Sequence, residues 1–132
     1  MSNIVVRAMK EPIKAIASDL LVVVKSMGHQ KRLQIMIELL EHSLSFQSLL
    51  HLTELKKTAL SHHLKDLMEA GLIEKPSYGA YAISLDGENY LRALYEAHNN
   101  SLAVQQQKLK KMQSRPPSNE FIRAFLHLEE KS

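Results

Sequence analysis

Apolar side chains recur at steps of three and four residues along most of the chain, the spacing that places them on one face of an amphipathic helix. The first stripe, over residues 13–27, follows Pro12, whose fixed φ suits the first turn of a helix. A second helix is predicted over residues 31–41, and Ser45 has the side chain of an N-cap for a third, short helix. The apolar positions expected in these two helices are Leu33, Met36, Ile37 and Leu40, followed by Phe46, Leu49, Leu50 and Leu52.

A fourth helix is predicted from residue 57 or 58 to Ala70, because four apolar side chains form one stripe there. Gly71 follows this helix at the position where a left-handed residue ends many helices. Two short apolar segments, residues 72–75 and 80–84, flank turn-forming residues and predict a β-hairpin. The stripe of the fourth helix consists of Leu60, Leu64, Leu67 and Met68.

A fifth helix is expected to begin at an Asp86 cap and to continue to about Gln113, because nothing breaks it before the Ser-Arg-Pro-Pro sequence at 114–117. One face of this helix has heptad spacing over about three heptads, which predicts contact with a partner helix. The positions of this seam are Leu91, Tyr95, His98, Leu102, Gln105, Leu109 and Met112. A last short helix is expected over residues 118–131. Through Phe121, Ile122 and Phe125 it should dock on a dimer of this chain or cover a pocket.

A short helix, a tight connection, a second helix with a polar outward face and a following hairpin are the parts of a winged helix-turn-helix. The predicted fold class is therefore mainly α with a small β-hairpin, with extended N- and C-terminal helices. Short donors and acceptors beside lysines suit a helix in the major groove of DNA, although a solvated helix face can have the same pattern. The outward face consists of Thr58, Ser61, His62, Lys65 and Glu69, with Lys56 and Lys57 at its N-terminal tip.

Two stretches of sequence make this interpretation more specific. Gly28-His-Gln-Lys-Arg-Leu-Gln-Ile-Met-Ile-Glu-Leu-Leu40 resembles the opening of the ArsR-type family of winged-helix repressors, in which His/Asp-Pro-x-Arg-Leu-x-Ile-Leu begins a helix. Leu55-Lys-Lys-Thr-Ala-Leu-Ser-His-His-Leu-Lys-Asp-Leu-Met-Glu-Ala-Gly-Leu-Ile73 is similar to the recognition helix of that family. The resemblance covers about residues 28–90 and implies a transcriptional regulator that binds DNA.

The resemblance places Lys57, Thr58, Ser61 and His62 at DNA-facing positions, with His63 on their flank. We expect Ser61 and His62 to contact base edges and the lysines to contact phosphates, and protonation of His62 beside phosphates would tighten binding as the pH falls from about 8 to 6. The complete set of expected DNA contacts is Lys56, Lys57, Thr58, Ser61, His62 and Lys65, with Lys75 and Tyr78 in the wing. The sequence departs from the family pattern at four positions: Lys56 replaces the usual Ser N-cap, Glu54 the usual turn glycine, Leu50 a usually small residue and Gln30 the usual proline.

In the resembling family the first and last long helices build a two-fold dimer. We therefore expect a homodimer that binds double-stranded DNA at a pseudo-palindromic operator. The expected interface residues are Ile13, Ile16, Leu20, Val24, Tyr95, His98, Leu102, Leu109 and Met112.

Composition limits the other functions. The 132 residues include no cysteine, which excludes disulfides, Cys-based metal sites and a thiol nucleophile. The sequence has no Gly-rich phosphate loop and no nucleophile motif, so we do not expect this protein to be an enzyme. The longest strongly apolar run, residues 20–24, is too short to span a bilayer, and residues 1–10 lack the features of a signal peptide. A cytoplasmic protein without a membrane partner is therefore expected.

Two alternatives stay open. Residues 29–75 contain six basic and six acidic side chains and thus no net charge, which would also suit a winged-helix module that binds protein instead of DNA. A metal-responsive repressor with His and carboxylate ligands is the other alternative. Only half of the family's dimer-helix metal signature is present, at Glu96 and His98, because Leu109 and Met112 occupy the other ligand positions. No metal, cofactor or small-molecule effector is assigned.

Together these patterns predict one structural domain with four segments. Residues 1–28 form an N-terminal dimerisation helix, residues 29–85 the DNA-binding core, residues 86–113 a long dimerisation helix, and residues 114–132 a Pro-linked C-terminal helix. The expected function is that of a sequence-specific transcriptional repressor.

Overall fold

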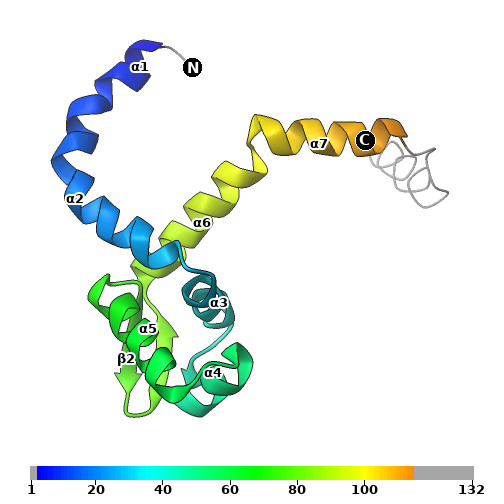
Figure 1. Ribbon diagram of the computed structural model, residues 1–132. Coiled ribbons are helices and arrows are strands. Elements are labelled where there is room, and N and C mark those ends of the chain that lie inside the picture. Colours follow the sequence, from blue (N-terminus) through cyan, green and yellow to red (C-terminus); the bar gives the residue numbers. More distant parts are fainter. Residues whose placement is uncertain (1–2, 115–132) are drawn as a thin grey trace, which may run out of the picture. The chain divides into compact units, whose positions relative to one another are not determined.

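The computed structural model describes residues 3–114 of a chain that divides into two compact units, residues 1–91 and residues 92–132. The boundary between the units lies within a helix, α6, whereas the sequence places a segment boundary between residues 85 and 86. The first unit contains, in chain order, α1 (Asn3–Ala8), α2 (Lys10–Met27), α3 (Gln30–Glu38), β1 (Leu44–Ser45), α4 (Phe46–Thr53), α5 (Lys57–Glu69), β2 (Ile73–Ser77), β3 (Ala80–Ile83) and the beginning of α6 (Leu85–Asn99). The second unit contains the rest of α6 and α7 (Leu102–Ser114). The predicted winged helix-turn-helix, mainly α with a β-hairpin, is confirmed (Figure 1).

The sequence predicts two of the signals that begin or end helices of the first unit, at Ser45 and Gly71, but not the cap at His29. Ser45 caps α4, since its Oγ accepts a hydrogen bond from the Ser48 backbone N–H at 3.1 Å. Gly71 has a φ of 75°, in the left-handed region, and ends α5. His29 caps α3 through its Nδ1, which accepts from the Lys31 N–H at 3.1 Å.

The wing is an antiparallel sheet with strand order β1-β3-β2. β2 and β3 form the predicted hairpin, and Gly79 in its turn has a φ of 78°. The third strand, β1, pairs Leu44 with Tyr81 and was not predicted. It consists of two residues, so it is too short for a polar and apolar alternation to be recognised in the sequence.

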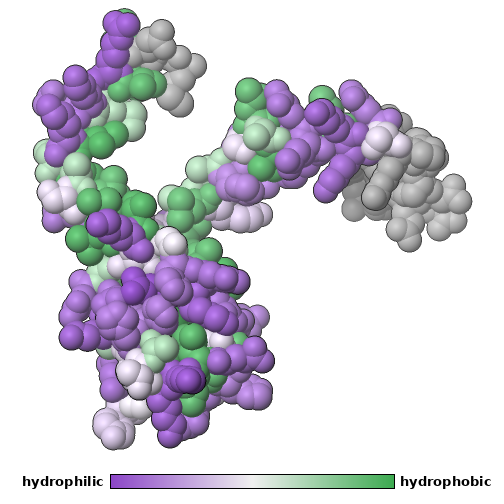
Figure 2. All heavy atoms as spheres, viewed as in Figure 1, coloured by the Kyte–Doolittle hydropathy of each residue, from purple (hydrophilic) through white to green (hydrophobic). Residues whose placement is uncertain are grey.

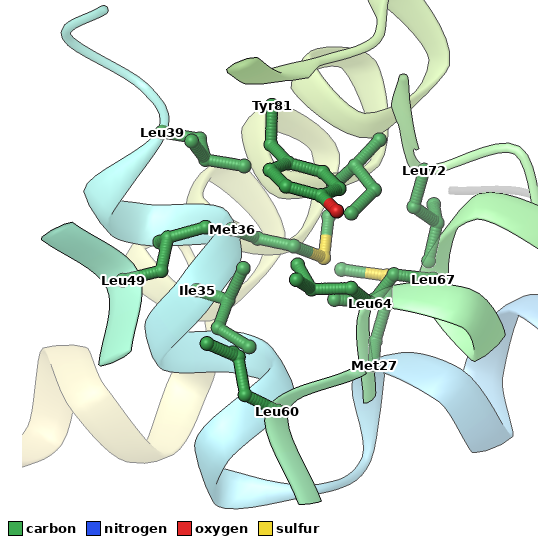
Figure 3. Packing of buried hydrophobic residues seen from close by; sticks show 11 residues of the cluster. Met27, Ile35, Met36, Leu39, Leu49, Leu60, Leu64, Leu67, Leu72 and Tyr81 are labelled. Atoms are coloured by element: carbon green, nitrogen blue, oxygen red, sulfur yellow. The ribbon is translucent and has the colours of Figure 1, made fainter. Parts of the chain in front are cut away.

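A single apolar core joins α3, α4, α5 and the sheet. Figure 3 shows its side chains pointing toward one another, with the ring of Tyr81 among residues of α3 and α5. The predicted stripe of α5 is confirmed, because Leu60, Leu64 and Leu67 are fully buried and Met68 packs against them.

The predicted apolar face of α3 is wrong in part. The structure buries Ile35, Met36 and Leu39, whereas Ile37 and Leu40 are 51% and 48% exposed. Two different stripes of this segment have helical spacing, and the sequence alone does not decide between them. The helix also ends at Glu38, so Leu40 lies beyond it and does not continue its face.

α6 begins one residue earlier than predicted and has a different cap. Ser84, and not Asp86, supplies the side-chain oxygen, which accepts from the Gly87 N–H at 2.9 Å. The same hydroxyl donates to the Gly71 carbonyl oxygen at 2.7 Å, so Ser84 joins the start of α6 to the end of α5. A Cβ at Gly87 would lie 2.2 Å from the Leu72 carbonyl oxygen, so only glycine fits this approach.

The predicted continuous helix from residue 86 to residue 113 is also wrong. α6 ends at Asn99, and α7 begins at Leu102 after Ser101, whose Oγ accepts from the Val104 N–H at 3.2 Å. The side chains of Asn and Ser compete for backbone hydrogen bonds, so three consecutive residues of this kind end a helix without Pro or Gly. The predicted heptad seam is therefore divided between two helices, with Tyr95 and His98 on α6 and Leu102 on α7.

α2 confirms the predicted first long helix, and α1 precedes it without having been predicted. Many apolar side chains of α1 and α2 lie at the surface of the described chain, as the green spheres in Figure 2 show. Among residues 3–114, none of the helices is long and apolar enough to span a membrane. The predicted C-terminal helix with Phe121, Ile122 and Phe125 lies outside the described residues.

Candidate nucleic-acid interface

The core fixes the rotation of α5 about its own axis. Leu60, Leu64 and Leu67 are spaced by one helical turn or nearly so, and all three are buried. The opposite face of α5 must therefore point to solvent. The exposed side chains of this face and of the N-terminal tip are those expected from the sequence, namely Lys56, Lys57, Thr58, Ser61, His62, Lys65 and Glu69.

The turn before α5 brings lysines, and not a capping side chain, to the N-terminus of this helix. Lys56 is the N-cap residue and makes no side-chain capping hydrogen bond. Glu54, which replaces the usual turn glycine, has a φ of 58° and is the one non-glycine residue with positive φ among residues 3–114. Within the turn, the buried Thr53 hydroxyl donates to the Leu49 carbonyl oxygen at 2.7 Å.

One arginine connects α3 to α5 outside the apolar core. The Arg32 Nε donates to the His63 Nδ1 at 3.0 Å, and its Nη2 donates to the Asp66 Oδ2. His63 and Asp66 lie one turn apart on α5, and the arginine side chain is only 15% exposed. The guanidinium therefore holds two successive turns of α5 against α3.

His63 belongs to this inner cluster and not to the outward face. Its ring lies 4.5 Å from the ring of His29, between centroids, and is half-buried. Burial lowers the pKa of His63 below its ordinary value of 6.5, and the positive charges of His29, Arg32 and His62 lower it further, against a smaller opposing effect of Asp66. Neutral His63 then has an unprotonated Nδ1 that accepts the Arg32 hydrogen bond.

His62 lies on the other side of Asp66. Its Nε2 is 3.3 Å from the Asp66 Oδ2, the same oxygen that accepts from Arg32, and its side chain is 68% exposed. Asp66 thus stands between a residue that supports α5 and a residue that faces solvent.

α3 also supports the end of α4, the first helix of the helix-turn-helix. Lys31 donates from Nζ to the Thr53 carbonyl oxygen at 2.7 Å, and Gln34 donates from Nε2 to the Leu52 carbonyl oxygen at 3.0 Å. Both acceptors lie in the last turn of α4, where carbonyl groups lack partners within the helix. These bonds fix the turn from which α5 starts.

In the wing, the ammonium group of the exposed Lys75 lies near two aromatic rings. Its Nζ lies 5.6 Å from the ring centroid of Tyr78 and 5.3 Å from that of Tyr81. Tyr81 is buried in the core and Tyr78 is fully exposed. The wing therefore presents one lysine and one aromatic ring, the two residues expected there.

Apolar side chains expected at a dimer interface lie at the surface of the described chain. Ile13, Ile16 and Val24 of α2 are exposed, and Leu20 is partly exposed. In α6 and α7 the exposed residues of the predicted interface are Tyr95, His98, Leu102, Leu109 and Met112.

The patterns in the sequence do not predict the contacts of Arg32 with His63 and Asp66. Arg32 is 31 positions from His63 and 34 positions from Asp66 in the sequence. No local pattern links residues so far apart, so only the fold reveals the contacts. Within residues 3–114 no group of three or more His, Cys, Asp or Glu side chains is placed to hold a metal ion.

The chain is similar in sequence and in fold to known proteins of one family. The family model described as bacterial regulatory protein, arsR family, matches residues 29–75. HlyU from Vibrio cholerae N16961 is 30% identical over 61% of this chain and 91% of its own, with a TM-score of 0.53. No curated protein matches the chain significantly.

Two further solved structures extend the similarity. NolR from Sinorhizobium fredii is 26% identical over 76% of this chain and 97% of its own, with a TM-score of 0.53. A homodimeric winged helix-turn-helix DNA-binding domain of a possible ArsR-family transcriptional regulator from Mycobacterium bovis is 25% identical, over 67% of this chain and 86% of its own, with a TM-score of 0.57. The present chain belongs to the ArsR family of bacterial regulatory proteins and is a DNA-binding transcriptional regulator.

Proposed function

We propose that the protein is a sequence-specific repressor, which binds a pseudo-palindromic operator as a homodimer and inserts α5 into the major groove. The observation that carries this proposal is the outward face of α5. It presents Ser61 and His62 at its centre, with Lys57 and Lys65 on either side, all of them exposed. Hydroxyl and imidazole groups can contact base edges, and the ammonium groups can contact phosphates.

The surface of the long helices supports the dimer. Apolar side chains of α2 and, separately, of α7 are exposed in the single chain, and exposed apolar helix faces of this kind commonly mark a protein interface. The Mycobacterium bovis domain is described as homodimeric. A two-fold dimer would present two copies of α5 to successive major grooves, which suits a pseudo-palindrome.

We also propose that the protein acts in the cytoplasm, where its DNA is, and that it needs no metal or cofactor for binding. A protein-binding role of the same surface is the second candidate. It is favoured by the absence of net charge over residues 29–75 and by the single lysine in the wing.

Selection of bound fragments from genomic DNA by the purified full chain tests the proposal. A repressor of this kind enriches fragments with a shared two-fold motif, and its affinity for them falls steeply with rising salt, because lysines that contact phosphates release counterions. Absence of enrichment would overturn the proposed sequence-specific binding to an operator and favour the protein-binding candidate.

A further inference from the structure

We propose that Asp66 is a positioning residue for DNA recognition, which fixes the tautomer of His62 and so sets the kind of base edge that this histidine contacts. The inference rests on the proposed function, because it concerns how α5 distinguishes one base pair from another. A single oxygen atom, Asp66 Oδ2, faces both Arg32 and His62.

Arg32 holds the Asp66 carboxylate in place. Its Nη2 donates to Oδ2, and its Nε is engaged with His63 at 3.0 Å, so the guanidinium is fixed at two points. The bond to His63 fixes the guanidinium, and the charge-assisted hydrogen bond from Nη2 then restricts the movement of the Asp66 carboxylate. Asp66 is therefore a fixed negative charge on α5 and not a side chain that turns freely toward solvent.

The fixed carboxylate determines which nitrogen of His62 carries the hydrogen. An ionised carboxylate accepts hydrogen bonds and donates none. The His62 Nε2 lies 3.3 Å from Oδ2, where an N–H is attracted and an unprotonated nitrogen lone pair is repelled. Neutral His62 therefore keeps its hydrogen on Nε2 and leaves Nδ1 as an acceptor for an external partner.

An acceptor at Nδ1 predicts a donor on the DNA. In the major groove, the amino groups of adenine N6 and cytosine N4 are the donors, whereas guanine and thymine present acceptors. Protonated His62 would donate from Nδ1 and reverse this preference. The charged and titratable groups that face His62 are Asp66 and His63 of α5, the latter at 6.2 Å between ring centroids, and Arg32 of α3 through Asp66.

The first experiment reads the tautomer directly in the full chain. Nitrogen-15 NMR of histidine-labelled wild-type protein at pH 8 distinguishes protonated from unprotonated ring nitrogens. We expect the Nε2–H form of His62 in wild-type protein and a mixture of both forms in Asp66→Ala. A Nδ1–H form or an equal mixture in wild-type protein would overturn the proposal, whatever the variant does.

The second experiment measures base preference. The position that His62→Ala relaxes is identified in the selected operator, and each of the four base pairs is placed there. At pH 8 wild-type protein should prefer adenine or cytosine on the contacted strand by about 5- to 100-fold, and Asp66→Ala should reduce that preference to about twofold or less.

Glu69→Ala is the matched control, because it also removes a carboxylate from α5, but one that lies beside Lys65 and leaves the pair of Asp66 and His62 intact. It should retain the base preference at pH 8. An unchanged preference in Asp66→Ala would overturn the inference while leaving the proposed function standing. A wild-type protein that selects no DNA would instead contradict the proposed function itself.

Discussion

The Nε of Arg32 in α3 donates a hydrogen bond to the Nδ1 of His63 in α5, at 3.0 Å. The bond joins the two stretches of sequence that resemble the family, because one residue lies in each of them. It also turns His63 away from the outward face, so that two adjacent histidines of α5 have different surroundings. His63 supports the helix, and His62 is left exposed.

Replacing Arg32 by Met should destabilise the fold. The change leaves the Asp66 carboxylate and the His63 Nδ1 without their donor in a half-buried site, and the loss of such bonds to a charged group costs about 1–3 kcal/mol. The free energy of unfolding from a urea titration measures this loss. Arg92→Met is the control, since Arg92 is exposed and its replacement should change stability by less than about 0.5 kcal/mol. Equal effects of the two changes would contradict the supporting role of Arg32.

Stability should fall as the pH decreases from about 7 to 5. The pKa of His63 is lowered in the folded chain, so below about 6.5 the unfolded chain binds a proton that the folded chain does not. This difference favours unfolding until the pH falls below the lowered pKa. Urea titrations across this range should give a smaller pH dependence for His63→Gln than for wild-type protein. The exposed His51, changed to Gln, should leave the slope as in wild type; the same slope in His63→Gln would refute the assignment.

Glu54→Gly should stabilise the protein. Glu54 has a φ of 58°, and a left-handed conformation costs a residue with a Cβ about 1–2 kcal/mol, which glycine avoids. A change to glycine at Lys65, an exposed residue inside α5, should instead destabilise by about 1 kcal/mol. Thermal unfolding of both variants measures the two signs. A loss of stability in Glu54→Gly would show that the turn does not have this conformation in solution.

Residue type and spacing predict the parts of this fold that depend on local chemistry. Ser45 begins α4 because its side chain caps the helix, and Gly71 ends α5 because a residue without a side chain adopts a positive φ readily. The buried leucines of α5 form one unambiguous apolar stripe in the sequence. The outward face of α5 was predicted for the same reason, because a fixed inner face determines the outer one.

Other features depend on competition between alternatives of similar energy or on distant contacts. Ile35 and Leu39, and not Ile37 and Leu40, face the core because the rest of the fold selects one of two possible stripes. The helix is interrupted before Ser101 because Asn and Ser side chains have a modest preference for ending helices, and no Pro or Gly marks this position in the sequence. The contact between Arg32 and α5 is created by the fold, so no pattern within either helix predicts it.

A charge at Leu102 should weaken the proposed dimer. Leu102 and Leu85 are both 72% exposed in the single chain, so neither Leu102→Asp nor Leu85→Asp should disturb folding of the monomer. Leu102 belongs to the expected interface, where an unpaired buried charge would cost several kcal/mol, and Leu85 does not. Sedimentation velocity should show dissociation for Leu102→Asp alone. A wild-type monomer at micromolar concentration would contradict the dimer.

We propose above all that α5 recognises the base sequence of the DNA. Loss of a base contact at Ser61 or His62 should cost about 1–3 kcal/mol and relax the preference at one or two base pairs. Loss of a phosphate contact at Lys57 or Lys65 should weaken binding to all sequences alike and lower the salt slope by about one unit. The two kinds of contact therefore leave different signatures in binding data.

The most direct measurement compares wild-type protein with the double variant Ser61→Ala, His62→Ala on the selected operator and on its single base-pair variants, at two salt concentrations. Both residues are exposed, so the variant should fold as wild type does, which thermal unfolding checks. We expect weaker operator binding, a relaxed preference at the contacted base pairs and an unchanged salt slope. Unchanged affinity and unchanged sequence preference would mean that the outward face of α5 does not read DNA.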